Sequence, residues 1–275
     1  MASGNRETRI ESTAAELIEM LGSTRQIAPL SSRYPDFDFA QAYAISERVC
    51  DARRARGEVP VGRKIGFTNR SIWAGAGIAA PIWGYMFNST VHDLASIGET
   101  FDLGNLPEPR IEPEIALHLA RAPSLDMDEA ALLECIDWIA HGFEVVYSIY
   151  PGWKLTAADA AAACGVHAAL LLGEKHAIVA DRAGWGKALA GFSVDLVCDD
   201  GTRAQGHASN ELGGPVSSLR FLVQELARYP TSAPLSAGEV ITTGTLTDAL
   251  PARSGQTWHT ELRGIDIGGI RVRFR

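Results

Sequence analysis

The sequence lacks several features that mark common classes of protein. Its four cysteines, Cys50, Cys135, Cys164 and Cys198, are widely scattered and form no CxxC pair. Neither a zinc knuckle nor a disulfide framework is therefore indicated, and we expect four buried thiols in a reducing compartment. The longest apolar stretch, AAAACGVHAALLLG, cannot span a bilayer. The polar start MASGNRETRIES has no signal-peptide core. We therefore expect a cytoplasmic protein with no membrane partner.

The chain also lacks a run of lysine or arginine, and its net charge is −8. A mildly acidic chain of this kind is a poor candidate for binding nucleic acid. Phosphate-loop patterns are missing too, so the Gly-rich pieces WAGAGIAA and TTGTLT are interpreted as turns. What is present is an ordinary globular composition, 46% hydrophobic and 21% charged, enough for one large domain or two small ones.

The order of the expected elements favours an α+β fold. Residues 11–21 and 38–56 have helical spacing, and Asp38 and Gly57 are suited to begin and end the second helix. Later elements are shorter: strands at 110–119 and 142–150, a helix over 128–140, a capped helix beginning at Thr156, a hairpin over 192–207 and a helix over 215–229. Leading helices followed by short strands argue against alternating βαβ units.

Three glutamates in apolar, strand-like runs stand out. In RIEPEIALHL, residues 110–119, alternation puts the isoleucines and leucines on a core face, and Glu112 and Glu114 together on the other, ~7 Å apart along the backbone. Glu144 lies in the nearly apolar run GFEVVYSIY. Burying unpaired carboxylates is costly, and Mg²⁺, Mn²⁺ or Ca²⁺ would remove that cost. The alternative is a solvated face, with Glu112 and Glu114 paired to Arg110 or Arg121.

Six pieces of the sequence together resemble the motifs of one enzyme family. In chain order they are PLSSRYPDFDFAQAYAISERV, GRKIGFTNR, RIEPEIALHL, FEVVYS, GWKLTAAD and ITTGTLTDALPARSGQTW. This order resembles the 2-keto-4-pentenoate hydratase group of the fumarylacetoacetate hydrolase superfamily, which also contains the oxalocrotonate decarboxylases. The resemblance covers almost the whole chain. It implies a rolled, mixed β-sheet with flanking helices, an N-terminal helical segment over residues 1–60, one catalytic unit over 61–275, and a homo-oligomer.

The resemblance also implies roles for individual residues. Metal ligands for Mg²⁺ or Mn²⁺ would be Glu112, Glu114 and Glu144. Lys64 would be catalytic as a general acid or base, with its pKa lowered by the nearby cation. Thr245 and Thr247 would line the substrate carboxylate.

Some positions depart from the family pattern. Asn88 and Ser89 stand where the family has two aspartates, Tyr147 replaces an aspartate, and AACGVHAA brings in His167. We expect His167 to be catalytic, and Asn88 and Arg253 to contact the substrate. These departures lie near the expected pocket and leave the substrate open.

The implied activity is a divalent-metal-dependent lyase of aromatic catabolism. It would add water to a 2-hydroxy-2,4-dienoate, a small 2-oxo acid enolate, and release a 4-hydroxy-2-oxo acid. Two alternatives stay open. One is a decarboxylase of a 2-oxo-3-enedioate, in which Arg63, Arg70 or Arg253 meets the second carboxylate. The other is a non-catalytic partner subunit of such an enzyme.

Two smaller questions concern side chains around the expected site. Trp73, Trp83 and Tyr85 could form an apolar lid over a planar substrate or belong to the core. His118 shares the glutamate face and could tune the site or be structural.

Overall fold

The computed structural model describes residues 2–229 and 231–275. The helices are α1 (Ala2–Met20), α2 (Leu30–Arg33), α3 (Phe39–Ala55), α4 (Trp73–Ala76), α5 (Glu129–Leu133), α6 (Ala157–Ala162), α7 (Arg182–Gly191) and α8 (Pro215–Arg228), with short 3₁₀ turns η1 (Arg70–Ile72), η2 (Pro151–Trp153), η3 (Cys164–Val166) and η4 (Ala208–Asn210). The strands are β1 (Pro60–Gly66), β2 (Ile82–Phe87), β3 (Val91–Asp93), β4 (Thr100–Phe101), β5 (Arg110–Leu119), β6 (Ile136–Val146), β7 (His167–Ala177), β8 (Ser193–Cys198), β9 (Arg203–His207), β10 (Val240–Thr242), β11 (Leu250–Pro251), β12 (Thr257–Arg263) and β13 (Arg271–Phe274). None of the helices in these ranges has both the length and the apolar character to cross a membrane.

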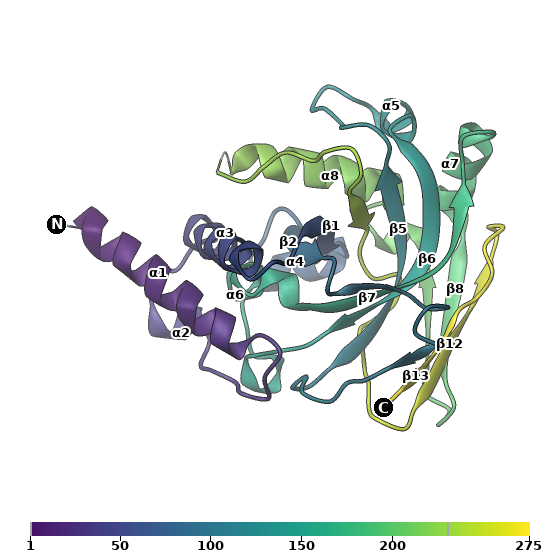
Figure 1. Cartoon of the computed structure of the whole chain (residues 1–275). Helices are drawn as coiled ribbons and strands as arrows, with labels where there is room; N and C mark the ends of the chain where they lie inside the picture. Colours follow the sequence, from purple (N-terminus) through teal and green to yellow (C-terminus); the bar gives the residue numbers. More distant parts are fainter. Residues whose placement is uncertain (1, 230) are drawn as a thin grey trace.

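Two mixed sheets form the frame of the molecule (Figure 1). Within the described residues, the larger sheet has the order β2-β1-β10-β5-β6-β7-β3, with β11 added to the start of β5. Its β1–β10 and β3–β7 pairs are parallel, and its other pairs are antiparallel. The smaller sheet has the order β4-β13-β12-β8-β9. The expected α+β class with a rolled, mixed sheet is confirmed.

The two faces of β5, β6 and β7 have different neighbours. Ile111, Phe143 and Leu171 pack against Trp258 and Phe274 of the smaller sheet. This covering accounts for Ile111 on the core face expected from the alternation in RIEPEIALHL, while Ile115, Leu117 and Leu119 of the same face lie in the larger core cluster. The opposite face of β5 carries Glu112 and Glu114, so it turns into the interior of the rolled sheet, toward the site described below.

The N-terminal helices lie to one side of the sheets, at the left of Figure 1. Helix α1 packs against α3, and α3 packs against α6. Asp38 begins α3, as expected, because its side chain accepts a hydrogen bond from the Gln41 backbone N–H. Strand β1 then starts at Pro60. The division into segments 1–60 and 61–275 stays a prediction.

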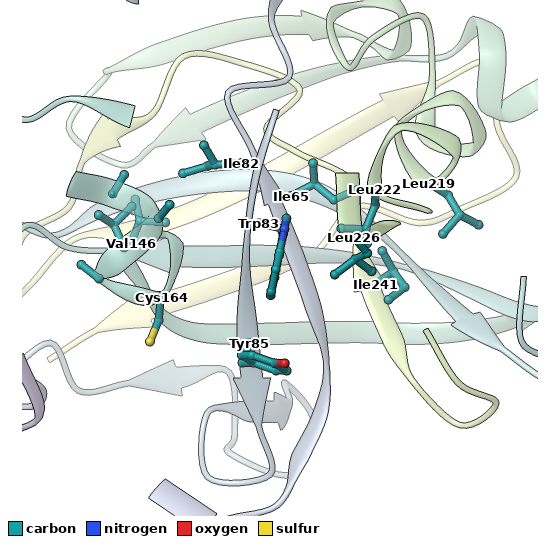
Figure 2. Packing of buried hydrophobic residues seen from close by; sticks show 14 of the residues in the cluster. Ile65, Ile82, Trp83, Tyr85, Val146, Cys164, Leu219, Leu222, Leu226 and Ile241 are labelled. Carbon is teal, nitrogen blue, oxygen red and sulfur yellow. The ribbon is translucent and has the colours of Figure 1, made fainter. Parts of the chain in front are cut away.

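The aromatic residues after Lys64 belong mostly to the core. Trp83 is 0% exposed and Tyr85 is 1% exposed. Figure 2 shows both rings on β2, with leucines of α8 on one side and Val146 and Cys164 on the other. Of the two alternatives for these side chains, the core is therefore confirmed for Trp83 and Tyr85. All four cysteines are buried and free, as expected.

The helix predicted over residues 128–140 is confirmed only in its first part. Residues 128–140 have a helical pattern, but only α5, Glu129–Leu133, is helical, and β6 begins at Ile136. From there the chain pairs with β5 on one side and β7 on the other. The two long ladders pair the backbone hydrogen-bonding groups of residues 136–140 on both sides of the strand, which a short helix could not do. Tertiary strand pairing therefore overrides the local helix propensity.

Candidate active site

The three glutamates singled out in the sequence lie together. In the register between β5 and β6, Glu112 is directly opposite Glu144, and Glu114 is two residues further along the same face of β5. One carboxylate oxygen from each residue lies within 4.8 Å of the other two. Glu114 and Glu144 are buried, and Glu112 is partly exposed. This burial excludes the alternative of a solvated, ion-paired face for Glu114.

Glu144 is held by two basic side chains. Lys64 of β1 donates from Nζ to Glu144 Oε2 over 2.7 Å. His167, at the start of β7, places Nδ1 2.8 Å from Glu144 Oε1, and its Nε2 lies 3.0 Å from the Thr90 hydroxyl. All three side chains are at most 4% exposed. Both oxygens of one buried carboxylate are therefore engaged by residues from different strands.

The surroundings give the carboxylates different charge states. Burial by itself would raise the pKa of Glu144, but Lys64 and His167 outweigh it and lower that pKa to about 2. Burial and then the Glu144 charge raise the pKa of Glu114 well above its usual value. Burial raises the pKa of Glu112 to about 7, although Lys64 opposes the rise. Near neutral pH, Glu144 is therefore ionised, whereas burial and the Glu144 charge favour the protonated form of Glu114.

Lys64 stays charged despite its burial. Burial would lower its pKa, yet Glu144, Glu112 and Glu114 together raise it to about 12. The buried His167 keeps a lowered pKa and is neutral. From the sequence we expect a bound cation to lower the pKa of Lys64. The raised pKa is the effect of the three glutamates alone.

The site has the donor chemistry of a divalent-metal centre. Glu114 Oε2 accepts a hydrogen bond from the Gly244 backbone N–H over 3.0 Å, while its buried Oε1 has no hydrogen-bond partner. An orphaned carboxylate oxygen facing two other carboxylates is a costly arrangement unless a cation meets it. Oxygen-only ligands suit Mg²⁺, Mn²⁺ or Ca²⁺. The residues present therefore fit the expected ion.

A cavity of about 490 Å³ opens beside this cluster. Lys64 and Glu112 line it together with Thr245 and Thr247, so four of the sequence-predicted site residues meet there. Its walls are mixed: Ile65, Phe67, Ile72, Ile82, Val166 and Leu246 are apolar, and Thr68, Asn69, Arg110, Gln205, Asn210 and Asp248 add polar groups. A cavity of this size with both kinds of group on its walls suits a small planar acid.

Two expected substrate contacts lie elsewhere. Asn88 accepts a hydrogen bond from the Val59 backbone N–H and does not line the cavity. Arg253 is exposed and also lies outside the lining residues.

Two other arginines considered for the substrate's second carboxylate lie outside the cavity too. Arg63 is buried, paired with Glu239 and packed over the Tyr85 ring. Arg70 stacks on Trp73 and Phe221. His118 is paired with Asp137 and stacked on Trp138, at the far end of β5 from Glu112.

The structure also reveals participants that the sequence reasoning missed. Arg110 lines the cavity, and its position two residues before Glu112 could have indicated this. His141 holds the Glu114 backbone carbonyl through Nδ1 over 2.9 Å, and Thr260 through Nε2 over 2.9 Å. Thr243 bridges Glu211 and the Ile115 carbonyl. The contacts of His141 and Thr243 join distant parts of the chain, so no local sequence pattern predicts them.

Comparisons with known proteins agree with this geometry. The chain is 30% identical over 269 residues to a 2-keto-4-pentenoate hydratase from Paraburkholderia phymatum, covering 98% of both chains. It is 28% identical to a 2-hydroxyhexa-2,4-dienoate hydratase from Comamonas testosteroni, covering 95% of this chain and 97% of the other. No protein-family model matches.

Among solved structures, the fold is similar to that of 4-oxalocrotonate decarboxylase from Pseudomonas putida G7, a complex with magnesium and adipate. The TM-score is 0.87, the identity 23%, and 98% of each chain is covered. The identity and coverage of the hydratase relatives, together with this fold, confirm the resemblance read from the six motifs. The chain therefore belongs to the family of 2-keto-4-pentenoate hydratases, which are lyases.

Proposed function

We propose that the protein is a divalent-metal-dependent hydratase that adds water to a 2-hydroxy-2,4-dienoate and releases a 4-hydroxy-2-oxo acid. The observation that carries the proposal is the cluster of Glu112, Glu114 and Glu144, with Lys64 bonded to Glu144, beside the cavity that Glu112 and Lys64 line. The relatives named as hydratases, which match the chain nearly end to end, support water addition as the main activity.

In this proposal Glu112, Glu114 and Glu144 hold Mg²⁺ or Mn²⁺. The bound ion supplies Lewis-acid polarisation of the substrate's 2-oxo group and stabilises the negative charge of the enolate. Magnesium is the first choice because the similar decarboxylase structure holds it.

Lys64 moves protons in the proposed mechanism. Its Nζ lies at the cavity, bonded to Glu144, and it enters the reaction as the ammonium form. It can protonate C5 of the dienol, whose 2-hydroxyl gives up its proton as the 2-oxo group forms. When water adds at C4, Lys64 takes back a proton from the water, and C3 receives the proton that the 2-hydroxyl released. Thr245 and Thr247 line the same cavity and can hold the substrate carboxylate.

His167 has a supporting part. It binds Glu144 Oε1 while Thr90 fixes its other nitrogen, so the carboxylate that carries Lys64 cannot rotate. The apolar walls at Ile65, Ile82 and Val166 match the flat hydrocarbon part of a dienoate and limit the entry of bulk water.

The test is product NMR on the purified protein with Mg²⁺. 2-Hydroxypenta-2,4-dienoate and 2-oxo-3-hexenedioate are supplied in parallel, with an EDTA-treated control and the Glu114→Gln variant. A 4-hydroxy-2-oxo acid that forms only in the metal-loaded parent protein is the expected result. Loss of CO₂ from the dioate without hydration would replace the proposal by the decarboxylase alternative. No turnover in any tube would refute both.

The remaining expectations complete the proposal. We infer a cytoplasmic location, supported by the four free thiols, and a homo-oligomeric assembly, supported by the family. Sedimentation of the purified protein measures the assembly directly.

A further inference from the structure

Glu211 is a buried carboxyl group that the proposed mechanism does not use. It directly follows the turn η4 and is 0% exposed. Its Oε2 lies 2.8 Å from the Thr243 hydroxyl, and its Oε1 has no hydrogen-bond partner in the part of the chain that the structure describes. Burial raises the pKa of Glu211 well above its usual value, and no neighbouring cation among the described residues opposes the rise. These surroundings favour the neutral acid.

The hydrogen bonds of Thr243 indicate independently that Glu211 carries a proton. The Thr243 hydroxyl lies 3.0 Å from the Ile115 backbone carbonyl and 2.8 Å from Glu211 Oε2. The carbonyl can only accept, and the hydroxyl has one proton to give. If Thr243 donates to Ile115, Glu211 must donate to Thr243, and only a protonated carboxyl group can do so. An ionised Glu211 would instead be a buried charge with one hydrogen bond and no cation, which is a costly arrangement.

This chain of donors ends beside the metal-binding cluster. Ile115 follows Glu114 in β5, and the Thr243 backbone N–H also donates to the Ile115 carbonyl, over 3.1 Å. The next residue, Gly244, donates its N–H to Glu114 Oε2 over 3.0 Å. Holding Thr243 against Ile115 therefore also holds the N–H group that orients the Glu114 carboxyl.

The residues on either side of Glu211 bind two segments of the cavity wall. Asn210 Nδ2 donates to the Leu246 carbonyl over 2.9 Å, and the Leu212 N–H donates to the Thr68 carbonyl over 3.2 Å. Thr68, Asn210 and Leu246 all line the cavity. Leu212 has a φ of +55°, a left-handed conformation that a residue other than glycine keeps when its surroundings hold it there. This short segment thus connects the chain that follows β1 to the chain that follows β10, with Glu211 at its centre.

We propose that Glu211 is a positioning residue, which as a neutral acid holds Thr243 and so fixes the Gly244 N–H at Glu114 and places Thr245 at the cavity wall. Its effect on metal binding rests on the proposed function, since it assumes that Glu114 is a ligand. The positioning of the Gly244 N–H needs neither metal nor substrate.

Hydrogen exchange of the backbone amides, followed by NMR in EDTA, measures the positioning directly. Glu211→Met removes the donor and should raise the exchange rate of the Gly244 amide by about 3- to 10-fold relative to the amides of β6, because one neutral hydrogen bond is lost. Glu211→Gln should keep the parent rate, because its amide N–H can donate to Thr243 as the acid does. A rise at Gly244 no larger than in β6 would show only a general loss of stability and overturn the inference. Equal rates in the Gln and Met variants would overturn it as well.

A second substitution tests the same chain of donors from its other member. Thr243→Val keeps the shape of the side chain and removes the hydroxyl, so the Gly244 amide should again exchange faster. The double variant Glu211→Met/Thr243→Val should exchange no faster than either single variant, because both substitutions break one chain of hydrogen bonds. Additive effects would contradict the proposal. Glu225→Met is the matched control, since Glu225 is also buried but pairs with Arg228 on α8, outside the cavity, and it should leave the Gly244 rate unchanged.

Calorimetric titration with Mg²⁺ then tests the consequence for the metal. Glu211→Met and Thr243→Val should each weaken binding by about 3- to 10-fold, and Glu211→Gln should bind as the parent does. Parent-like affinity in the Met variant would overturn the link between Glu211 and the metal site. If the parent itself binds no Mg²⁺, the proposed function fails, and the exchange rates still decide whether Glu211 positions Gly244.

Discussion

Replacing either of the two buried glutamates, Glu114 or Glu144, by glutamine should affect the stability of the metal-free protein in different ways. The metal-dependent activities implied by the family resemblance predict that Glu112→Gln or Glu144→Gln stops turnover with little effect on folding. The contacts of Glu144 change that expectation for the metal-free protein. In Glu144→Gln, the buried Lys64 ammonium loses its bonded partner, and His167 loses the acceptor at Nδ1. Breaking one side of a buried ion pair costs about 3–5 kcal/mol. Glu112 and Glu114 still lie near Lys64, so we expect a loss near ~3 kcal/mol.

Glu114→Gln should behave differently. Burial and the Glu144 charge favour the protonated form of its carboxyl, and an amide oxygen can still accept from the Gly244 N–H. The unfolded chain carries Glu114 as a carboxylate at pH 7, so the raised pKa opposes folding of the parent and not of the variant. We expect an unchanged or higher free energy of unfolding. Both variants should lose Mg²⁺ binding, since each removes an ionisable ligand.

The measurement is urea denaturation in EDTA at pH 7, with the free energy of unfolding extrapolated to water. The double variant Lys64→Met/Glu144→Gln is the control, and it should recover much of the loss by removing the unpaired cation. The sign of the pH dependence follows from the depressed pKa of Glu144. Glu144 contributes to the free energy of unfolding above the ordinary glutamate pKa of about 4.3, and this contribution is lost as the pH falls toward about 2. The free energies of unfolding of the parent and Glu144→Gln should therefore converge below pH ~4. Equal destabilisation by Glu114→Gln and Glu144→Gln would refute this reasoning.

Three further outcomes follow from the same contacts. Lys64→Met should bind Mg²⁺ at least about tenfold more tightly by calorimetry, because a buried cation next to the ligands is removed; weaker binding would contradict the electrostatic argument. Mg²⁺ affinity of the parent should fall as the pH drops from 8 to 6, because protons compete for Glu112, whose pKa is about 7; a flat profile would exclude this competition. Gly165→Ala should cost at least ~1–2 kcal/mol in thermal or urea unfolding, because φ is +66° there and a Cβ would lie 2.5 Å from Lys64 Cδ. Gly75→Ala, where a Cβ meets open space, is its control, and equal effects would show that the contact with Lys64 does not matter.

Local alternation predicted the part of the site that lies on one strand. The period of two in RIEPEIALHL correctly places Glu112 and Glu114 on one face of β5. Glu144 required more, because its place opposite Glu112 depends on the register between β5 and β6. The capping box at Thr156 and Asp159 and the hairpin of β8 and β9 were also readable, since short-range hydrogen bonds determine them.

The rest of the site depends on packing between distant segments. Lys64 and His167 are 103 positions apart in the chain numbering, and they meet only because β1 and β7 both border the interior of the rolled sheet, where Glu144 receives them. Asn88 shows the converse. It stands at a position that the family resemblance marks as near the pocket, yet its side chain caps the Val59 backbone instead. Sequence motifs identify which residues belong to a family pattern, whereas side-chain direction is set by tertiary contacts.

The charge states explain how this chain can fold around four buried or partly buried ionisable groups before any metal binds. Glu144 balances Lys64, burial favours the protonated form of Glu114, and Glu112, with a pKa of about 7, is divided between its two forms. These shifts reduce the negative charge of the metal-free site, which limits the penalty for burying it. A divalent ion needs Glu112 and Glu114 as carboxylates, so its binding must release protons. Lys64 repels a divalent ion, and the Glu144 carboxylate that would bind the ion also holds Lys64. Metal binding and the freedom of Lys64 to meet a substrate are therefore coupled through this carboxylate.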